Sequence, residues 1–78
     1  MTRYYFDIRD GASFCKDEDG HELEDLKAAE IETAETLADI AKEFAPFEED
    51  QRIVVEVRTA QGPVLKAMLS IELAPRHE

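Results

Sequence analysis

The fold is decided by residues 26–44, LKAAEIETAETLADIAKEF, where apolar side chains recur with the roughly 3.6-residue period of an α-helix. The apolar side of this helix is predicted to hold Leu26, Ala29, Ala34, Leu37, Ala38, Ile40, Ala41 and Phe44. Leu37 and Phe44 lie near its centre, so we expect them to be buried against a sheet. Asp25 is the predicted N-cap, because its carboxylate can accept a bond from a free N–H of the first turn. Pro46 ends the helix, since proline has no N–H and its ring clashes with a preceding turn.

The residues before the helix have the period of β-strands. Residues 3–9, RYYFDIR, alternate between two faces, and Tyr4, Phe6 and Ile8 share one of them. Asp10-Gly11 follows, a dipeptide that turns a hairpin easily. A short second strand is predicted over residues 13–16, with Phe14 facing inward.

Two further strands are predicted after the helix. Residues 52–59, RIVVEVRT, alternate again, and Gln61-Gly62-Pro63 marks a turn. Residues 64–73 form a long fourth strand, and residues 74–78 form a polar tail. Between the second strand and the helix, residues 17–20 are expected to be a polar turn and residues 21–24 a connector.

This order predicts one α+β domain over residues 1–78, with ββαββ topology. Hairpins on both sides of one helix favour a four-stranded antiparallel sheet with the amphipathic helix packed on one face. Four strands at about 4.8 Å spacing need a cover roughly 15–19 Å wide, whereas a helix is only about 10–12 Å across. One helix therefore leaves part of the sheet uncovered, which favours curled edges or a second chain.

Charge is distributed unevenly along the chain. The net charge is −10, which opposes binding to nucleic acid and to anionic membranes. The predicted strands hold six basic and three acidic residues, which leaves three basic and sixteen acidic residues elsewhere. This pattern fits either strand charges that discourage aggregation or a mildly basic recognition face. The residues of that possible interaction face are Tyr5, Arg9, Val54, Arg58, Lys66 and Met68.

No metal or cofactor site is predicted. Asp17, Asp19 and Gly20 match three positions of a calcium-binding EF-hand loop, but Cys15 and Leu26 then fall where oxygen ligands are required. The only candidate nitrogen or sulfur ligands are Cys15, His21 and His77, fewer than the four that structural zinc prefers. The acidic residues 17–20 are therefore interpreted as a turn, with weak cation binding as the alternative.

An enzyme is not predicted either. Cys15 with His21 is the only nucleophile and base combination, and no known signature surrounds it. The three glycines fall in separate turns, so there is no glycine-rich phosphate loop and no evident small-molecule ligand. One cysteine cannot form an intrachain disulfide, and the first residues lack the apolar run of a signal peptide. We expect a cytoplasmic protein.

Two segments carry a resemblance to a known family. Residues 1–11 fit the pattern M-x-R-Y-[FY]-F-[DH]-[IV]-x-[DN]-G, and residues 17–29 fit D-x-x-G-x-E-L-x-D-L-x-A-A. The chain thereby resembles a family of short uncharacterised bacterial proteins, classed as a domain of unknown function. The resemblance implies a helix and a C-terminal hairpin after these segments, and no function. The acidic residues 48–50 and the glutamate-rich helix depart from relatives that often have arginines there.

A fainter similarity is to HicB-type antitoxins, which also open with an aromatic strand, a D-G turn, an acidic loop and a helix rich in alanine and glutamate. That similarity implies an acidic inhibitor of a basic nucleic-acid-processing partner. Two strands follow the helix here, and no separate DNA-binding segment remains. The leading prediction is a small non-enzymatic protein-interaction or regulatory module, acting on a protein partner or on itself as a homodimer.

Overall fold

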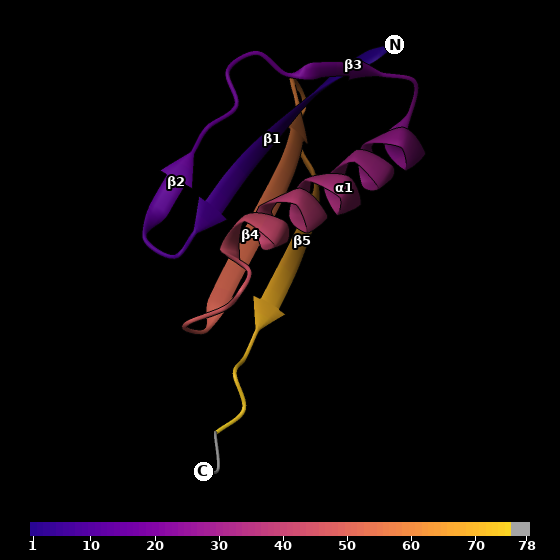
Figure 1. Ribbon diagram of the computed structural model, residues 1–78. Helices are drawn as coiled ribbons and strands as arrows, with labels where there is room; N and C mark the ends of the chain where they lie inside the picture. The colour runs from indigo at the N-terminus through magenta and orange to yellow at the C-terminus, as the bar shows by residue number, and fades with distance from the viewer. Residues whose placement is uncertain (76–78) are drawn as a thin grey trace.

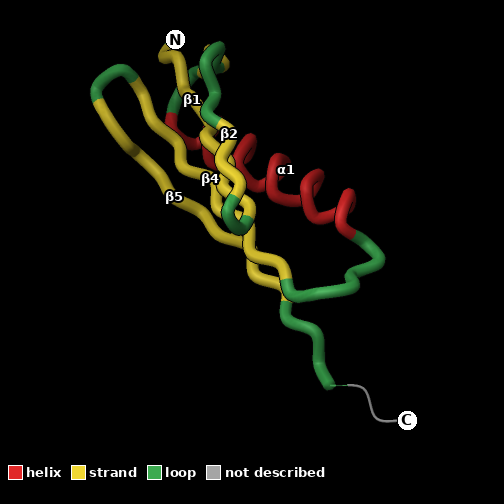
Figure 2. Tube along the Cα trace, turned by 90° about the vertical axis from the view of Figure 1, so that its left-hand side faces the viewer, coloured by secondary structure: helices red, strands yellow, loops and turns green. Residues whose placement is uncertain are grey.

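The computed structural model describes residues 1–75 as a sheet with one helix on one side (Figure 1). The last three residues of the expected tail, 76–78, lie outside the described residues, and His77 is one of them. The elements are β1 (Thr2–Asp10), β2 (Ser13–Cys15), β3 (His21–Leu23), α1 (Leu26–Phe44), β4 (Gln51–Thr59) and β5 (Gly62–Ile71). Figure 2 shows the two layers, with α1 on one side of the strands. The predicted α+β class is confirmed.

The sheet has five strands instead of the predicted four. Its order is β2-β1-β4-β5, with every pairing antiparallel, and β3 pairs with the first part of β1. The prediction that residues 21–24 are a connector was therefore wrong. A three-residue strand is too short for alternation to identify it, and β3 is recognisable only because Thr2, Arg3 and Tyr4 lie opposite it.

The core lies between α1 and the sheet. Tyr4, Phe6, Ala29, Val55 and Val57 form its buried cluster, so the predicted inward face of β1 is confirmed. Ile53, Val55 and Val57 of β4 are fully buried because β4 is the central strand between β1 and β5. Such burial contributes roughly 1.5–3 kcal/mol for each large aliphatic side chain.

The buried side of α1 differs from the predicted one. Ala29 and Thr33 are its buried residues, and Leu37 and Phe44 are only half-buried. The sequence did not predict that Thr33 is buried, because threonine is polar. Its hydroxyl donates to the Ala29 carbonyl oxygen at 2.7 Å, so its hydrogen-bonding capacity is satisfied inside the core. The remaining predicted residues include three that are exposed, namely Leu26, Ala34 and Ala38.

The ends of α1 follow the prediction. Asp25 is the N-cap, and its Oδ1 accepts a hydrogen bond from the Ala28 N–H at 3.0 Å. The helix ends at Phe44, two residues before Pro46. Within residues 1–75, no helix has the length and apolar character needed to cross a membrane.

Phe14 faces the other way from the prediction. It lies opposite Arg9 in the β1–β2 pairing, on the side of the sheet away from α1, and it is 48% exposed. Residues directly opposite in antiparallel strands share a face, so Phe14 follows Arg9 outward. The guanidinium carbon of Arg9 lies 4.6 Å from the centre of the Phe14 ring, a cation–π contact that covers part of the ring.

Candidate functional site

All six predicted interaction residues lie on the face of the sheet away from α1, which we call the open face. Cross-strand pairing places Tyr5 opposite Arg58, and it places Arg9, Val54 and Met68 in one row across β1, β4 and β5. Lys66 lies opposite Glu56 in the neighbouring row. Within residues 1–75, no helix or strand packs over this face (Figure 2). The six residues therefore share one face of the sheet, and their role as an interaction face stays a prediction.

Two of the six are occupied in holding the fold together. Arg58 Nε donates to Asp7 Oδ2 at 2.9 Å, and Arg58 Nη2 donates to the Asp17 carbonyl oxygen at 2.9 Å. The guanidinium carbon of Arg58 also lies 4.5 Å from the centre of the Tyr5 ring. Because the Arg58 guanidinium is bound to Asp7 and Asp17 and lies over the Tyr5 ring, neither Arg58 nor Tyr5 is fully available to a partner. The two residues form a border of the open face.

The other four residues surround a hollow of about 310 Å³. Val54 lies in its floor and is only 8% exposed, while Met68 is 45% exposed. Three cations surround them, from Arg9, Lys66 and Arg52, the last of which the sequence prediction did not include. We call this the basic hollow. It combines an apolar floor with a positively charged rim.

The charges of the basic hollow are only partly neutralised. Arg9 Nε lies 3.8 Å from Glu56 Oε1, a long and exposed ion pair that contributes little to stability. Arg52 Nε lies 3.2 Å from Met68 Sδ, a weak acceptor. Among the residues that the structure describes, Arg52 and Lys66 form no ion pair. Their positive charge is therefore available to an incoming acidic group.

Beside the basic hollow, a partly buried polar network joins β1, β4 and the acidic turn. Asp17 Oδ2 accepts from the Phe6 N–H at 3.0 Å, and Asp17 Oδ1 accepts from the Asp19 and Gly20 N–H groups at 3.1 and 3.0 Å. The Asp17 N–H in turn donates to Asp7 Oδ1 at 2.9 Å. The Asp17 carboxylate thus binds the backbone of the acidic turn itself and the backbone of β1.

Both carboxylates of the network are stabilised in the charged form. Burial raises the pKa of Asp7, but the hydrogen bonds from Arg58 and the Asp17 N–H and the charge of Arg58 outweigh it, so this pKa lies below its ordinary value of 3.8. Burial also raises the pKa of Asp17. Its hydrogen bonds from the Gly20, Phe6 and Asp19 N–H groups reverse the effect, and the pKa of Asp17 is likewise lowered.

Gly20 closes the acidic turn where a side chain does not fit. Its φ is +73°, and an added Cβ would lie 2.9 Å from Arg3 Cγ and 3.0 Å from both the Tyr4 carbonyl oxygen and Tyr5 Cδ2. Neither the backbone conformation nor the space suits another residue. Gly20 therefore brings the turn close to β1, where Arg3 Nη1 donates to the Asp19 carbonyl oxygen at 2.6 Å.

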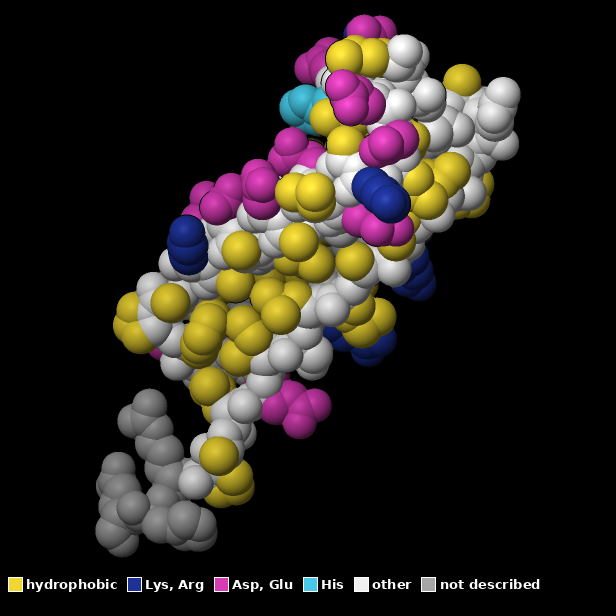
Figure 3. All heavy atoms as spheres, turned by 90° about the vertical axis from the view of Figure 1, so that its right-hand side faces the viewer, with side chains coloured by type: hydrophobic (Ala, Val, Ile, Leu, Met, Phe, Trp, Pro, Cys, Tyr) yellow, Lys and Arg dark blue, Asp and Glu magenta, His cyan; other side chains and the backbone are white. Residues whose placement is uncertain are grey.

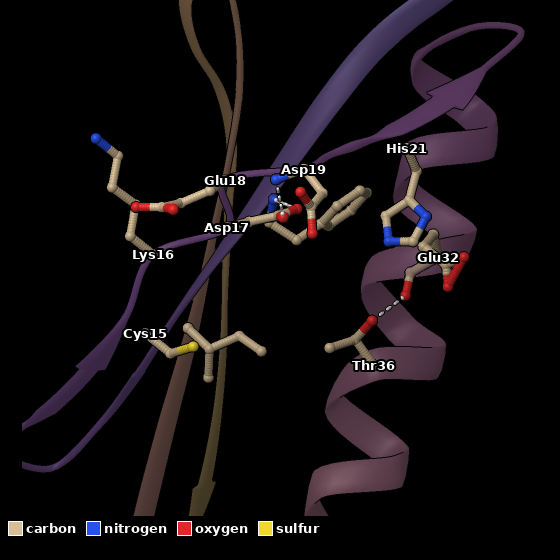
Figure 4. Close-up of a pocket in the computed structure, with 10 residues that line it drawn as sticks. Cys15, Lys16, Asp17, Glu18, Asp19, His21, Glu32 and Thr36 are labelled. Carbon is tan, nitrogen blue, oxygen red and sulfur yellow. Dashed lines mark hydrogen bonds between the residues drawn. The ribbon is translucent and has the colours of Figure 1, made fainter.

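A groove of about 480 Å³ lies on the helix side, where α1 does not cover β1 and β2 (Figure 4). Its floor is Phe6 and Ile8, and Cys15, His21 and Glu32 lie on its walls. His21 meets Phe6 edge to face, with ring centres 5.8 Å apart. This gap is the part of the sheet that the width of one helix leaves uncovered, as the sequence predicted.

The groove brings Cys15 and His21 onto its lining without an arrangement that suits a metal. No group of three or more histidine, cysteine, aspartate or glutamate side chains is placed to hold a metal ion within residues 1–75. Figure 4 shows Cys15 and His21 on different sides of the groove, with His21 beside Glu32. The groove is a gap in packing between α1 and the strands β1 and β2. The prediction of a non-enzymatic protein stays a prediction.

The sequence missed the polar network and Arg52. Asp7 reads as an ordinary outward residue of an alternating strand, and nothing in the sequence links it to Arg58 far along the chain. The signal that pointed to it was the resemblance, since Asp7, Asp17 and Gly20 all belong to the two matching segments. Arg52 could have been found by extending the alternation of Val54 and Arg58 by one more step of two.

The comparisons with known proteins agree with the resemblance at the level of the family. Neither the search of curated proteins nor the search of solved structures found a match. The family described as Domain of unknown function (DUF6894) matches residues 3–70, which contain all six elements except the first residue of β1 and the last of β5. The chain belongs to this family.

Proposed function

We propose that the protein is a small, non-enzymatic, cytoplasmic interaction module that binds a protein partner through the open face of its sheet and works as a homodimer. The observation that carries the proposal is the basic hollow, in which Arg9, Arg52 and Lys66 surround Val54 and Met68. A positively charged rim around an apolar floor suits an acidic peptide segment that also carries an apolar side chain. Arginine, methionine and aromatic residues are the types enriched in protein interfaces.

The surroundings of the basic hollow support a protein partner over nucleic acid. Met68 within the basic hollow and Phe14, which lies opposite Arg9, are both exposed and offer apolar contact area. The net charge of −10 repels a phosphate backbone, whereas a short acidic segment reaches the local positive charge without approaching the acidic helix. The partner that we propose is therefore a protein with a mixed acidic and apolar segment.

The open face is less suited to a second copy of the same chain. In a two-fold contact, both copies use the same surface, so a contact centred on the basic hollow would bring its cations, Arg9, Arg52 and Lys66, near those of the other copy. Like charges directly opposite one another destabilise a contact. Homodimer formation, which remains part of the proposal, therefore calls for a different surface.

Affinity capture from the native cell with three matched baits tests the proposed face. Arg9→Glu reverses a charge at the rim of the basic hollow, and Lys27→Glu makes the same change of charge on the exposed surface of α1. We expect a partner that the wild type and Lys27→Glu both retain and that Arg9→Glu loses. A partner retained equally by all three baits contradicts the use of the open face.

A second candidate function is an antitoxin-like inhibitor of a basic nucleic-acid-processing protein. The observation that favours it is the acidic outer side of α1, where Glu35, Asp39 and Glu43 are exposed, and Figure 3 shows acidic side chains in a row there. A basic partner lost when Glu35 and Asp39 are both changed to lysine, and kept by Arg9→Glu, would favour this candidate over the open face.

A further inference from the structure

The sheet has one long unpaired edge, along β5. Strand β1 has β2 and β3 along its outer side and β4 along its inner side. Strand β5, Gly62–Ile71, pairs with β4 only, and within residues 1–75 no element pairs with its other side. Backbone N–H and C=O groups along that side are free to bind another strand.

Most of this edge lacks the features that keep edge strands apart. Edges are usually protected by charged side chains, prolines, bulges or short length. Pro63 and an irregularity in the pairing at Val57/Arg58 both lie near the turn that opens the strand. From Leu65 to Ile71 the only charged residue is Lys66, in a chain of which 36% is charged. The edge is thus open over seven residues.

An apolar surface continues from this edge onto α1. Leu65, Ala67, Leu69 and Ile71 alternate along β5 on the side of α1 and stay only half-buried. Leu37 and Phe44 of α1 are half-buried as well. Figure 3 shows hydrophobic side chains gathered in one area beside the acidic row of the helix. A strand added at β5 would cover part of this surface.

We infer that a second copy of the chain adds its own β5 to this edge, antiparallel and around a two-fold axis at Met68. This inference rests on the homodimer of the proposed function and names the surface that forms it. The axis places Leu65 opposite Ile71 of the second copy, Lys66 opposite its Ser70, and Ala67 opposite its Leu69. Apolar residues then meet apolar residues on the helix side, and Lys66 meets a neutral residue on the open face.

The charges of the segment are compatible with pairing to a second copy. The two Lys66 side chains start about 14 Å apart in this register, at roughly 3.4 Å for each of four residues. That separation exceeds the screening length of about 8 Å at physiological ionic strength. Glu35 and Asp39, two exposed acidic residues, belong to α1 and not to β5, so neither is part of the paired strands.

Cysteine cross-linking tests the register. Opposed residues in antiparallel strands have Cα atoms about 4.5–5.5 Å apart, within the range of a disulfide. In a Cys15→Ser background, which removes the exposed native thiol, Met68→Cys is expected to form a disulfide-linked dimer under mild oxidation. The single variants Lys66→Cys and Ser70→Cys are the controls and are expected not to form a disulfide-linked dimer. The double variant with both substitutions is expected to form one. Equal cross-linking of all three single variants overturns the inference.

Sedimentation equilibrium separates this inference from the proposed function. Met68→Lys places two lysines face to face at the axis while lowering the net negative charge, so we expect a dimer of twice 8.9 kDa at micromolar concentrations for the wild type and a monomer for the variant. Ile31→Lys makes the same charge change at a residue of α1 that is 62% exposed and is expected to remain dimeric. Circular dichroism checks that both variants fold.

The outcomes are distinguishable. A wild-type dimer that Met68→Lys does not weaken overturns the β5 interface and leaves the homodimer of the proposed function standing. A wild type that remains at 8.9 kDa throughout the micromolar range overturns both the homodimer and the interface. Neither result bears on the proposed binding of a different protein at the open face, because that proposal is tested separately with Arg9→Glu.

Discussion

Arg58 and Asp7 stand 51 positions apart in the chain, yet Arg58 Nε donates to Asp7 Oδ2 at 2.9 Å. The pair joins β1 to β4, and through the Asp17 backbone it also joins both strands to the acidic turn. Asp7 is nearly buried and Arg58 is partly exposed. The ion pair is therefore one of the contacts that hold the acidic turn against the sheet, together with the hydrogen bond from the Phe6 N–H to Asp17 Oδ2.

Asp7→Asn is expected to lower the free energy of unfolding by about 1–3 kcal/mol, because the amide retains the shape of the carboxylate but cannot accept bonds at both positions. Urea unfolding at neutral pH measures this loss. Asp39→Asn on the exposed side of α1 is the control for the change of charge and should stay within about 0.5 kcal/mol of the wild type. Equal stability of wild type and Asp7→Asn contradicts the structural role of the pair.

Acid should weaken the fold over a defined range. The pKa values of Asp7 and Asp17 are lower in the folded chain than their ordinary value of 3.8, so between these values the unfolded chain binds more protons. The stabilisation that these two groups supply is complete above the ordinary value and is lost as the pH falls through the lowered pKa values. Urea midpoints measured from about pH 6 downward should show this decline. Asp7→Asn should flatten it, and a variant curve parallel to that of the wild type would contradict the assignment.

Gly20→Ala is expected to destabilise the protein more than Gly11→Ala. Both glycines have positive φ, +73° and +57°, so each substitution carries a backbone cost of roughly 1–2 kcal/mol. An alanine Cβ at Gly11 meets no atom within 4 Å, whereas at Gly20 it meets Tyr4 and Tyr5 at 3.0 Å. The difference between the two urea midpoints measures the steric part of the cost. Equal midpoints would show that the turn can move away from β1.

The strong periodic patterns in the sequence were sufficient for most of the fold. Alternation identified β1, β4 and β5 and their inward faces, since burial on one side of a strand imposes a period of two. The predicted fourth strand continued to residue 73, past the end of β5 at Ile71. There the alternation of apolar residues goes on after the backbone has left the sheet, and the Leu73 N–H donates instead to Asp50 Oδ1 at 2.9 Å.

What the sequence could not supply depends on contacts between distant residues. An aromatic residue such as Phe14 favours an inward position, but the register of the short hairpin puts it beside Arg9. The polarity of Thr33 favours an exposed position, yet Thr33 and Ala29 are the two buried residues of the helix. The six predicted residues share the open face because that follows from alternation, whereas Arg52 and Phe14, which lie on the same face, were not predicted there. The polar network around Arg58 could not be predicted, because it joins residues that are far apart in the sequence.

A core substitution in the sheet is expected to lower the free energy of unfolding more than one in the helix. Ile53→Ala removes most of a fully buried side chain from the central strand and is expected to cost about 2–5 kcal/mol. Leu37→Ala is expected to cost less than Ile53→Ala, because Leu37 is only half-buried on α1. Thermal or urea unfolding of both variants gives the order. The reverse order would mean that the helix interface, and not β4, is the centre of the core.

The acidic turn is expected to bind calcium no more tightly than a weak surface site. Calcium needs several oxygen ligands with free lone pairs, and both oxygens of Asp17 already accept backbone hydrogen bonds at 3.0–3.1 Å. Binding would have to release the Phe6 N–H, or those of Asp19 and Gly20, and so reopen the contact with β1. Calorimetric titration of the wild type and of Asp19→Asn measures the affinity, with Asp19 as the more exposed carboxylate of the turn. A dissociation constant in the low micromolar range for the wild type, lost in Asp19→Asn, would show that the turn rearranges around the ion and that its hydrogen bonds to β1 are not what holds it in place.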